Sequence, residues 1–308
     1  MKKLVLRICL FLFSLLVLGA LAGIIGFNLI NTYNGEIESS GEKRRYLLYV
    51  PESYNPAAPV PLVINIHGFA QWPAHQMTIS HWNDLADEYG FIVVYPMGTR
   101  FPLRWRTYAQ EGMEDGPERE VQFFSDLIDR LESQYNIDPA RIYANGLSNG
   151  GGMSFLLACK LSERIAAIGT VAGAYTTPWS ECNPGRPVPL MAFHGTDDPI
   201  VPYQGGEQSR MGTTFPSILE WVHTYARLNG CAETPVELPA SGEVSGIRYT
   251  ACSQGTEVVF YTIQGGGHSW PGGEPIPAWI VGYTSPDIDA SRVMWEFFRQ
   301  HPLESKQY

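Results

Sequence analysis

Gly146-Leu147-Ser148-Asn149-Gly150 is the stretch from which the fold of this 308-residue chain is best predicted. The residues before it, ending near Ala144, form a short apolar run typical of a buried strand, and a helix is expected from Asn149 onward. A Gly-x-Ser-x-Gly sequence between a strand and a helix is typical of a sharp turn that presents the serine hydroxyl at the edge of a sheet. Taken alone, the pentapeptide also fits a glycine-rich turn with an incidental serine.

Strand-like and helix-like segments alternate on both sides of this turn. Short apolar runs predict strands at residues 45–50, 61–66, 91–95, 142–144, 167–171, 189–193 and 258–263. Apolar residues at helical spacing predict helices at residues 81–89, 121–135, 149–160, 218–226 and 291–298. This alternation predicts a mostly parallel sheet with helices on both faces. No linker or repeat interrupts it, so we expect one catalytic domain over residues 33–308.

Polar turns follow three other predicted strands. His67-Gly68-Phe69 comes after the first buried strand, and we expect the backbone N–H of Phe69, with that of Asn149, to form an oxyanion hole. We expect His67 to orient this loop. A plain strand-to-helix turn that uses Gly68 is the alternative interpretation.

The other two turns carry an acid and a histidine, so that the chain order is serine, acid, histidine. Asp197 and Asp198 come after the strand at residues 189–193, and His268 after the strand at residues 258–263. Because the carboxyl ends of parallel strands share one edge of a sheet, Ser148 can meet His268 there. A histidine would accept the serine proton, and a carboxylate would hold the imidazole. Either aspartate fits, and we predict Asp198, because Pro199 favours extended backbone before it.

Three segments together resemble a known family. They are Gly-Leu-Ser-Asn-Gly-Gly-Gly-Met (146–153), His-Gly-Thr-Asp-Asp-Pro-Ile-Val-Pro-Tyr (194–203) and Gly-Gly-Gly-His-Ser-Trp-Pro-Gly (265–272). They are similar to the poly(3-hydroxybutyrate) depolymerase-like and feruloyl/acetylxylan esterase group of the α/β-hydrolase superfamily. The resemblance implies a secreted serine esterase with an α/β-hydrolase core and no metal or organic cofactor. It also implies Ser148 as nucleophile, Asp198 as acid and His268 as base.

The expected activity is hydrolysis of carboxylic esters through an acyl-enzyme, with polyhydroxybutyrate oligomers, feruloyl esters or acetyl esters as substrates. An acyltransferase with the same triad is the alternative, because both reactions share the acyl-enzyme. A catalytically inactive binding domain is disfavoured, because no triad member is missing. A nucleic-acid partner is excluded by the formal net charge of −10 and by the lack of a Lys/Arg run beyond the first residues.

The N-terminus predicts export. Lys2, Lys3 and Arg7 precede residues 8–30, which carry no charge and are long enough to span a bilayer. Ala20-Leu21-Ala22 also fits signal-peptidase cleavage. We therefore interpret residues 1–32 as a signal peptide or membrane anchor, with the length of the apolar run favouring the anchor. The domain is expected to be extracytoplasmic, either secreted or held at the membrane by residues 8–30.

Cysteine usage agrees with an exported domain. Four cysteines follow the N-terminal segment: Cys159, Cys182, Cys231 and Cys252. Three connectivities are open to four cysteines, and we expect the sequence-local pairs Cys159–Cys182 and Cys231–Cys252. Four buried free thiols are the alternative. Five tryptophans in loops after strands are candidates either for a substrate platform or for packing under those loops: Trp72, Trp105, Trp179, Trp270 and Trp279.

Overall fold

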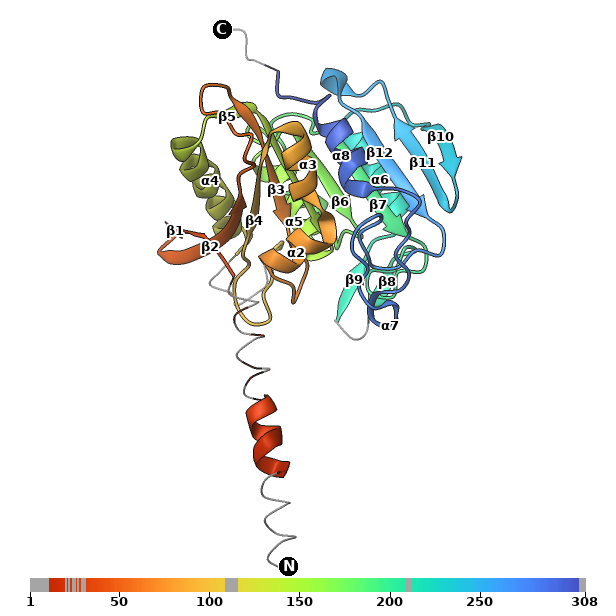
Figure 1. Cartoon of the computed structure of the whole chain (residues 1–308). Coiled ribbons are helices and arrows are strands. Elements are labelled where there is room, and N and C mark those ends of the chain that lie inside the picture. The colour runs from red at the N-terminus through yellow and green to blue at the C-terminus, as the bar shows by residue number, and fades with distance from the viewer. Residues whose placement is uncertain are drawn as a thin grey trace, which may run out of the picture.

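The structure is a computed structural model, and it describes residues 11–19, 21, 23, 26, 28, 32–108, 116–208 and 212–304. Residues 11–19 are helical and exposed, and Figure 1 shows this helix apart from the rest of the chain. Much of the predicted signal peptide or anchor at residues 1–32 lies outside the described residues. Among the helices that are described, none has the length and apolar character needed to cross a bilayer.

One large sheet organises the described part of the chain (Figure 1). Its strand order is β1 (Gly35–Ser39), β2 (Glu42–Tyr49), β4 (Ile92–Pro96), β3 (Val60–Ile66), β5 (Ile137–Leu147), β6 (Ala167–Val171), β7 (Leu190–Gly195), β12 (Val258–Ile263), β11 (Val244–Tyr249) and β10 (Val236–Ser241). The strands from β4 to β12 in this order are parallel to their neighbours, whereas the pairs at the two ends of the sheet are antiparallel. The predicted fold class is therefore confirmed.

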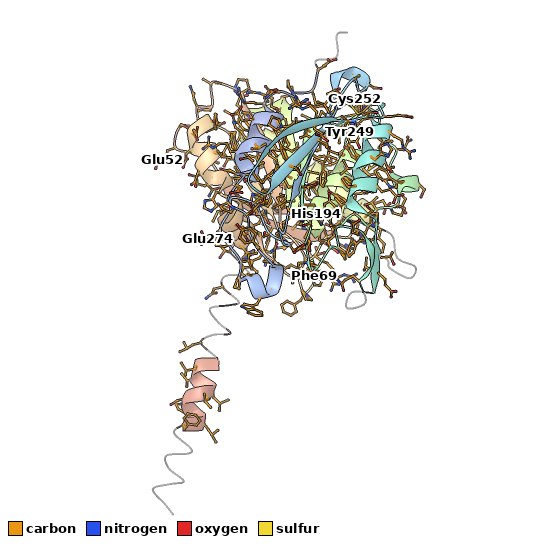
Figure 2. The ribbon with its side chains drawn as sticks, turned by 90° about the vertical axis from the view of Figure 1, so that its right-hand side faces the viewer. Glu52, Phe69, His194, Tyr249, Cys252 and Glu274 are labelled. Atoms are coloured by element: carbon orange, nitrogen blue, oxygen red, sulfur yellow. A yellow bond between two sulfur atoms is a disulfide. The ribbon has the colours of Figure 1, made fainter. Side chains whose placement is uncertain are left out.

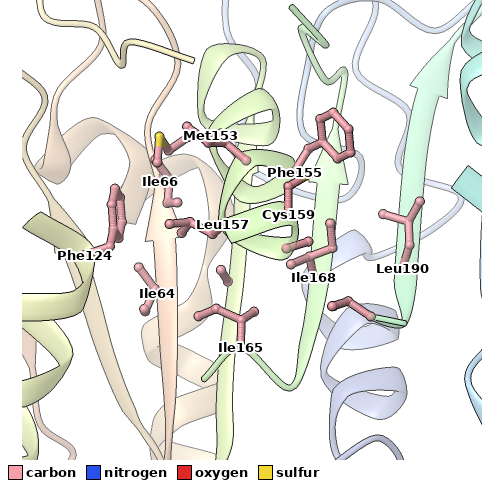
Figure 3. Packing of buried hydrophobic residues seen from close by; sticks show 14 of the residues in the cluster. Ile64, Ile66, Phe124, Met153, Phe155, Leu157, Cys159, Ile165, Ile168 and Leu190 are labelled. Carbon is pink, nitrogen blue, oxygen red and sulfur yellow. The ribbon is translucent and has the colours of Figure 1, made fainter. Parts of the chain in front are cut away.

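Helices cover both faces of the sheet. One face carries α4 (Pro117–Gln134), α5 (Asn149–Lys160) and α6 (Ile218–Leu228), and the other carries α2 (Pro73–Ser80), α3 (Trp82–Tyr89) and α8 (Ala290–Phe298). Successive strand residues point to opposite faces, so β3 contributes to two separate cores. Ile64 and Ile66 pack with Met153 and Leu157 of α5 (Figure 3), whereas Val63 belongs to the core under α3 and α8.

Seven of the described elements were not predicted, because their sequences lack a continuous or periodic apolar pattern. The edge strand β10 is largely exposed, and neither β1 nor β11 has a continuous buried run. The helix α2 begins at Pro73 and has no clear apolar stripe. The short helix α7 (Ala278–Val281) has one buried residue. The small hairpin of β8 (Gly206–Gln208) and β9 (Thr213–Phe215) is separate from the large sheet.

Two disulfides join segments that are close in sequence. Cys159, near the end of α5, is bonded to Cys182, and Cys231, just after α6, is bonded to Cys252. Their sequence separations are 23 and 21 residues. The chain therefore has the sequence-local connectivity.

Candidate active site

Ser148 lies in strained backbone between β5 and α5. Its φ angle of 56° falls in the left-handed region, which a residue with a Cβ rarely adopts. Neighbouring backbone holds it there, because the Ser148 amide donates to the Val171 carbonyl at 2.9 Å and its carbonyl accepts from the Ala174 amide at 2.9 Å. Strain that is maintained in this way is typical of functional sites.

The glycines around Ser148 allow the backbone to pack closely. A Cβ at Gly146 or at Gly150 would collide with the backbone carbonyl oxygen of Ile66 at the end of β3. At Gly152 it would collide with the carbonyl oxygen of Ala174. The glycine-rich sequence is therefore needed to bring the serine turn against the neighbouring strand end.

His268 and Asp198 meet beside this turn, although 70 residues separate them in the sequence. The Nδ1 of His268 donates to the Oδ2 of Asp198 at 2.7 Å, and both side chains are buried. The turns that carry them approach through glycine, because a Cβ on Gly195 would collide with the carbonyl oxygen of Gly266. This bond leaves Nε2 of His268 as the ring nitrogen able to exchange a proton with another group.

Asp198 is held by three hydrogen bonds and by a contact with His194. The amides of Ile200 and Val201 donate to Oδ1 at 2.8 Å each, and Nε2 of His194 lies 3.3 Å from Oδ2, which also accepts from His268. Burial raises the pKa of Asp198, but the charge of His268 and the polar contacts with His194 and His268 outweigh it, so the pKa lies well below its ordinary value. The group is therefore a carboxylate at neutral pH.

Asp197, the competing acid, does not share this environment. Its side chain is exposed, and its carboxylate accepts from the Thr196 hydroxyl at 3.3 Å. His194, in contrast, is buried and contacts both Asp198 and the Val201 carbonyl, at 2.9 Å. His194 was not among the site residues predicted from the sequence. Its position at the end of β7, four residues before the acid, was the available signal.

One cavity of about 830 Å³ brings four of the predicted site residues together. Ser148, His268, Asn149 and Phe69 all line it, and Asp198 lies behind His268. The lining is largely apolar and aromatic and includes Trp72, Trp105, Phe215, Ile276, Ile280 and Val281. Figure 2 shows Phe69 at one end of the molecule and Cys252 at the opposite end.

The two amides predicted to form the oxyanion hole have no acceptor among the described residues, whereas their neighbours do. The Gly68 amide donates to the Gln71 side chain at 2.8 Å, and the Ala70 amide donates to the Leu103 carbonyl at 2.8 Å. Phe69 and Asn149 therefore present free N–H donors on residues that line the cavity.

His67 supports the loop that carries Phe69. Its Nδ1 donates to the Gly68 carbonyl at 2.7 Å, and its Nε2 accepts from the Gly98 amide at 3.0 Å, which defines a neutral ring. Complete burial lowers the pKa of His67 to about 4, so the ring stays neutral at pH 7. Its carbonyl also accepts from the Trp105 indole at 2.9 Å. This agrees with the expected orienting role.

The Asn149 side chain joins the serine turn to another loop. Its Oδ1 accepts from the Trp105 amide at 2.7 Å, and its Nδ2 donates to the Trp105 carbonyl at 3.1 Å. A side-chain amide that binds both backbone groups of one residue fixes the two segments relative to each other. Only the Asn149 backbone had a predicted role, because a contact between segments 44 residues apart depends on how the loop folds.

The five candidate tryptophans have different environments. Trp72 and Trp105 line the cavity, and Trp179 lines a neighbouring pocket of about 400 Å³. Trp270 packs in the core on the α8 face, and Trp279 is 86% exposed on α7. Across the described ranges, no group of three or more His, Cys, Asp or Glu side chains is arranged to hold a metal ion.

Comparison with known proteins gives consistent matches. Residues 44–181 match the family model described as Esterase PHB depolymerase. The chain is 31% identical over 242 residues to the bifunctional acetylxylan esterase/xylanase XynS20E of Neocallimastix patriciarum, covering 78% of this chain and 32% of that protein. It is 27% identical over 277 residues to Feruloyl esterase C of Emericella nidulans, covering 86% of each.

A solved structure gives the corresponding result for the fold. The acetyl xylan esterase from Aspergillus awamori superposes with a TM-score of 0.57 at 15% identity, covering 86% of this chain and 98% of that one. The α/β-hydrolase fold and the resemblance expected from the sequence are thereby confirmed. The chain spans about a third of the length of the acetylxylan esterase/xylanase.

Proposed function

We propose that this chain, which belongs to the group of esterases described as Esterase PHB depolymerase, is a serine carboxylic-ester hydrolase that uses Ser148, Asp198 and His268. One observation carries the proposal: a histidine oriented by a buried carboxylate lines the same cavity as a serine in strained backbone. An isolated serine hydroxyl is a weak nucleophile, and this arrangement activates it.

The proposed reaction begins with proton transfer from Ser148. Because Nδ1 of His268 is engaged by Asp198, Nε2 accepts the serine proton as the oxygen attacks the ester carbonyl. The amides of Phe69 and Asn149 stabilise the negative charge on the carbonyl oxygen. The alcohol leaves with the proton from His268, and an acyl-enzyme remains. A water molecule deprotonated by His268 then releases the acid and restores Ser148.

The low pKa of Asp198 supports its role in this cycle. When His268 takes up the proton it becomes an imidazolium, and a carboxylate at 2.7 Å stabilises that charge. The three hydrogen bonds to Asp198 and its contact with His194 keep its position and ionisation constant during the cycle.

Substrates are proposed from the cavity and from the relatives. A largely apolar cavity of about 830 Å³ has room for an aliphatic or aromatic acyl group together with part of the alcohol. Feruloyl esters, acetyl esters and 3-hydroxybutyrate oligomers are therefore the proposed classes. Export is proposed as well, with residues 1–32 as signal peptide or membrane anchor, because two disulfides favour an oxidising compartment.

Replacement of the serine tests the proposal. Ser148→Ala is expected to abolish hydrolysis of p-nitrophenyl butyrate and labelling by a fluorophosphonate, because no other group would form the acyl-enzyme. Thermal unfolding of the variant checks that it remains folded. Turnover retained by a folded Ser148→Ala variant would refute the assignment. A panel of feruloyl, acetyl and 3-hydroxybutyrate esters then identifies the substrate.

A further inference from the structure

Arg104 places a cation in the catalytic cavity with no carboxylate or hydrogen-bond acceptor among the described residues. Its side chain is half-buried and lines the cavity with Ser148 and His268. The Nε atom is buried and has no hydrogen-bond acceptor, and no described carboxylate lies within ion-pair distance of the guanidinium. A guanidinium remains charged at physiological pH, and its desolvation is unfavourable without a compensating contact.

Other arginines of similar burial do have partners. Arg141 contacts Asp138 at 2.6 Å, and Arg164 contacts Glu132 at 2.9 Å. Arg186 donates to the Ser162 carbonyl at 2.7 Å. Arg104 therefore differs from them in its lack of an acceptor, not in its burial.

The backbone around Arg104 is fixed, so its position is not that of a free surface side chain. Arg104 and Thr99 exchange two backbone hydrogen bonds of 3.1 Å each. The next residue, Trp105, is held on both backbone groups by Asn149, and Arg106 donates to the buried Glu120 at 2.9 Å. Arg104 is thereby tied to the residue that follows Ser148.

The guanidinium of Arg104 lies beside the side chain of Phe69, whose amide is proposed for the oxyanion hole. Its guanidinium carbon lies 5.5 Å from the centre of the Phe69 ring, on the loop that offers the Phe69 amide. No aspartate or glutamate is found among the described residues that line the cavity. The other titratable lining residues are His268, His75 and Tyr108, and burial lowers the pKa of His75, which keeps that ring neutral.

Because the whole chain is acidic, the positive charge of Arg104 matters more for the binding of an anion in the cavity. The formal net charge is −10, so the long-range field does not favour the approach of anions. Within an apolar cavity, an arginine fork is suited to a carboxylate, which it can bind through two parallel N–H···O hydrogen bonds.

We propose that Arg104 binds a carboxylate carried by the ester substrate. The proposal rests on the proposed esterase function and specifies its substrate class: esters with an apolar body and a free acid group. The acid group is either on the acyl side, as in the monoester of a dicarboxylic acid, or on the alcohol side, as in a hydroxy-acid oligomer that ends in a carboxylate. The apolar lining holds the body of the substrate while Arg104 pairs with the acid.

Matched pairs of substrates test the proposal. The acyl-side pair is mono-p-nitrophenyl adipate and p-nitrophenyl hexanoate, and the alcohol-side pair is the 3-hydroxybutyrate dimer and its primary amide. Arg104→Met is expected to lower the ratio of kcat/KM for the charged member to that for the neutral member by roughly 10- to 100-fold in one pair, which identifies the side. Arg104→Lys should retain part of the preference, because it keeps the charge but not the fork.

A control variant separates local binding from overall charge. Arg299→Met removes one positive charge from an exposed residue that does not line the cavity, and it should leave both ratios unchanged. Ratios that are also unchanged in Arg104→Met would overturn the proposal. A general fall in kcat for charged and neutral esters alike would also overturn it, because Arg104 would then act on the oxyanion or on folding.

A binding measurement separates this proposal from the esterase assignment. Calorimetric titration of the 3-hydroxybutyrate dimer and of adipate into Ser148→Ala needs no turnover. Adding Arg104→Met to that variant is expected to weaken binding of at least one of these acids by roughly 10-fold or more. If the unmodified chain hydrolyses no ester, the esterase proposal fails, and this titration alone decides whether Arg104 binds carboxylates. If Arg104→Met left the affinity for each acid unchanged, the inference would be overturned.

Discussion

Two adjacent aspartates show how much environment determines the role of a residue. Asp197 is exposed, whereas Asp198 is 6% exposed, receives three hydrogen bonds and contacts His194. From the sequence both were candidates, and Pro199 was the local feature that separated them. The pattern of backbone amides around Asp198, which holds it as an anion, depends on the turn geometry and could not be predicted.

Asp198→Asn tests the acid at the residue scale. An amide in place of the carboxylate favours the wrong His268 tautomer and removes the charge that stabilises the imidazolium, so kcat is expected to fall by roughly 10⁴-fold. Asp197→Asn is the matched control, and its kcat should stay close to that of the unmodified chain. Steady-state kinetics with p-nitrophenyl butyrate checks both, and comparable losses in the two variants would contradict the assignment of Asp198.

His67 predicts a pH dependence of stability. Its pKa is lowered from 6.5 to about 4 by burial, so below pH 6.5 the unfolded chain binds a proton that the folded chain does not yet bind. The free energy of unfolding therefore falls as the pH drops from 6.5 to 4, and His67 contributes about 3 kcal/mol to that fall. Above pH 6.5, the full contribution of His67 to the free energy of unfolding is present.

His67→Gln should remove this part of the pH dependence. Between pH 7 and pH 4, the loss of unfolding free energy in urea is expected to be about 3 kcal/mol smaller in the variant than in the unmodified chain. The variant can be less stable at pH 7, because the hydrogen bonds to Gly68 and Gly98 are altered. An equal loss in both proteins would show that His67 is not the buried neutral group responsible.

At the scale of elements, a buried ion network fixes the loop before α4 to the sheet. Glu120 of α4 is fully buried and contacts Arg44 of β2 at 2.8 Å and Arg106 at 2.9 Å. Arg44 also lies over the Phe123 ring. The network therefore connects the strand β2, the helix α4 and the loop that carries Arg104 and Trp105.

Glu120→Ala is expected to be strongly destabilising. It leaves two arginines buried without their carboxylate, and a loss of about 3–5 kcal/mol in unfolding free energy follows. Glu118→Ala, an exposed change in the first turn of the same helix, should lose less than about 1 kcal/mol. Urea denaturation of both variants checks the difference. Similar small losses in the two would mean that the network is not maintained in solution.

Most of the central elements could be predicted from the sequence, because buried parallel strands and amphipathic helices have strong apolar patterns. The strand β3 and the helix α4, for example, agree with the predicted ranges within a few residues. The exposed strand β10 has no such pattern, since its stability comes from pairing with β11. The proline at the start of α2 likewise resembles a loop signal.

Only part of the candidate site could be predicted from the sequence. Ser148, His268 and Phe69 could be chosen because each follows a strand end in a recognisable turn. The contact between Asn149 and Trp105 could not be predicted, since it joins a strand-to-helix turn to a loop that has no regular pattern. Arg104 had no sequence signal either, because its significance comes from the absence of a partner in the folded cavity.

For the whole molecule, the disulfides contribute stability that depends on the redox environment. Cys159–Cys182 and Cys231–Cys252 close loops of 23 and 21 residues, and each is expected to contribute about 3 kcal/mol by restricting the unfolded chain. The double variant Cys159→Ser/Cys182→Ser should lose this amount in urea denaturation. Addition of a thiol reductant should destabilise the unmodified chain more than the double variant. Equal sensitivity to the reductant would contradict a stabilising role for this bridge.

Trp279 gives the molecule a natural optical reporter next in sequence to a residue that lines the cavity. It is 86% exposed on α7, next to Ile280, which lines the cavity, whereas tryptophans such as Trp82 and Trp221 are deeply buried. An indole in water emits at longer wavelength than one in a core, and soluble iodide quenches it readily. The quenchable, red-shifted part of the intrinsic fluorescence therefore belongs largely to Trp279. Occupancy of the cavity can be followed through this fluorescence without any added label.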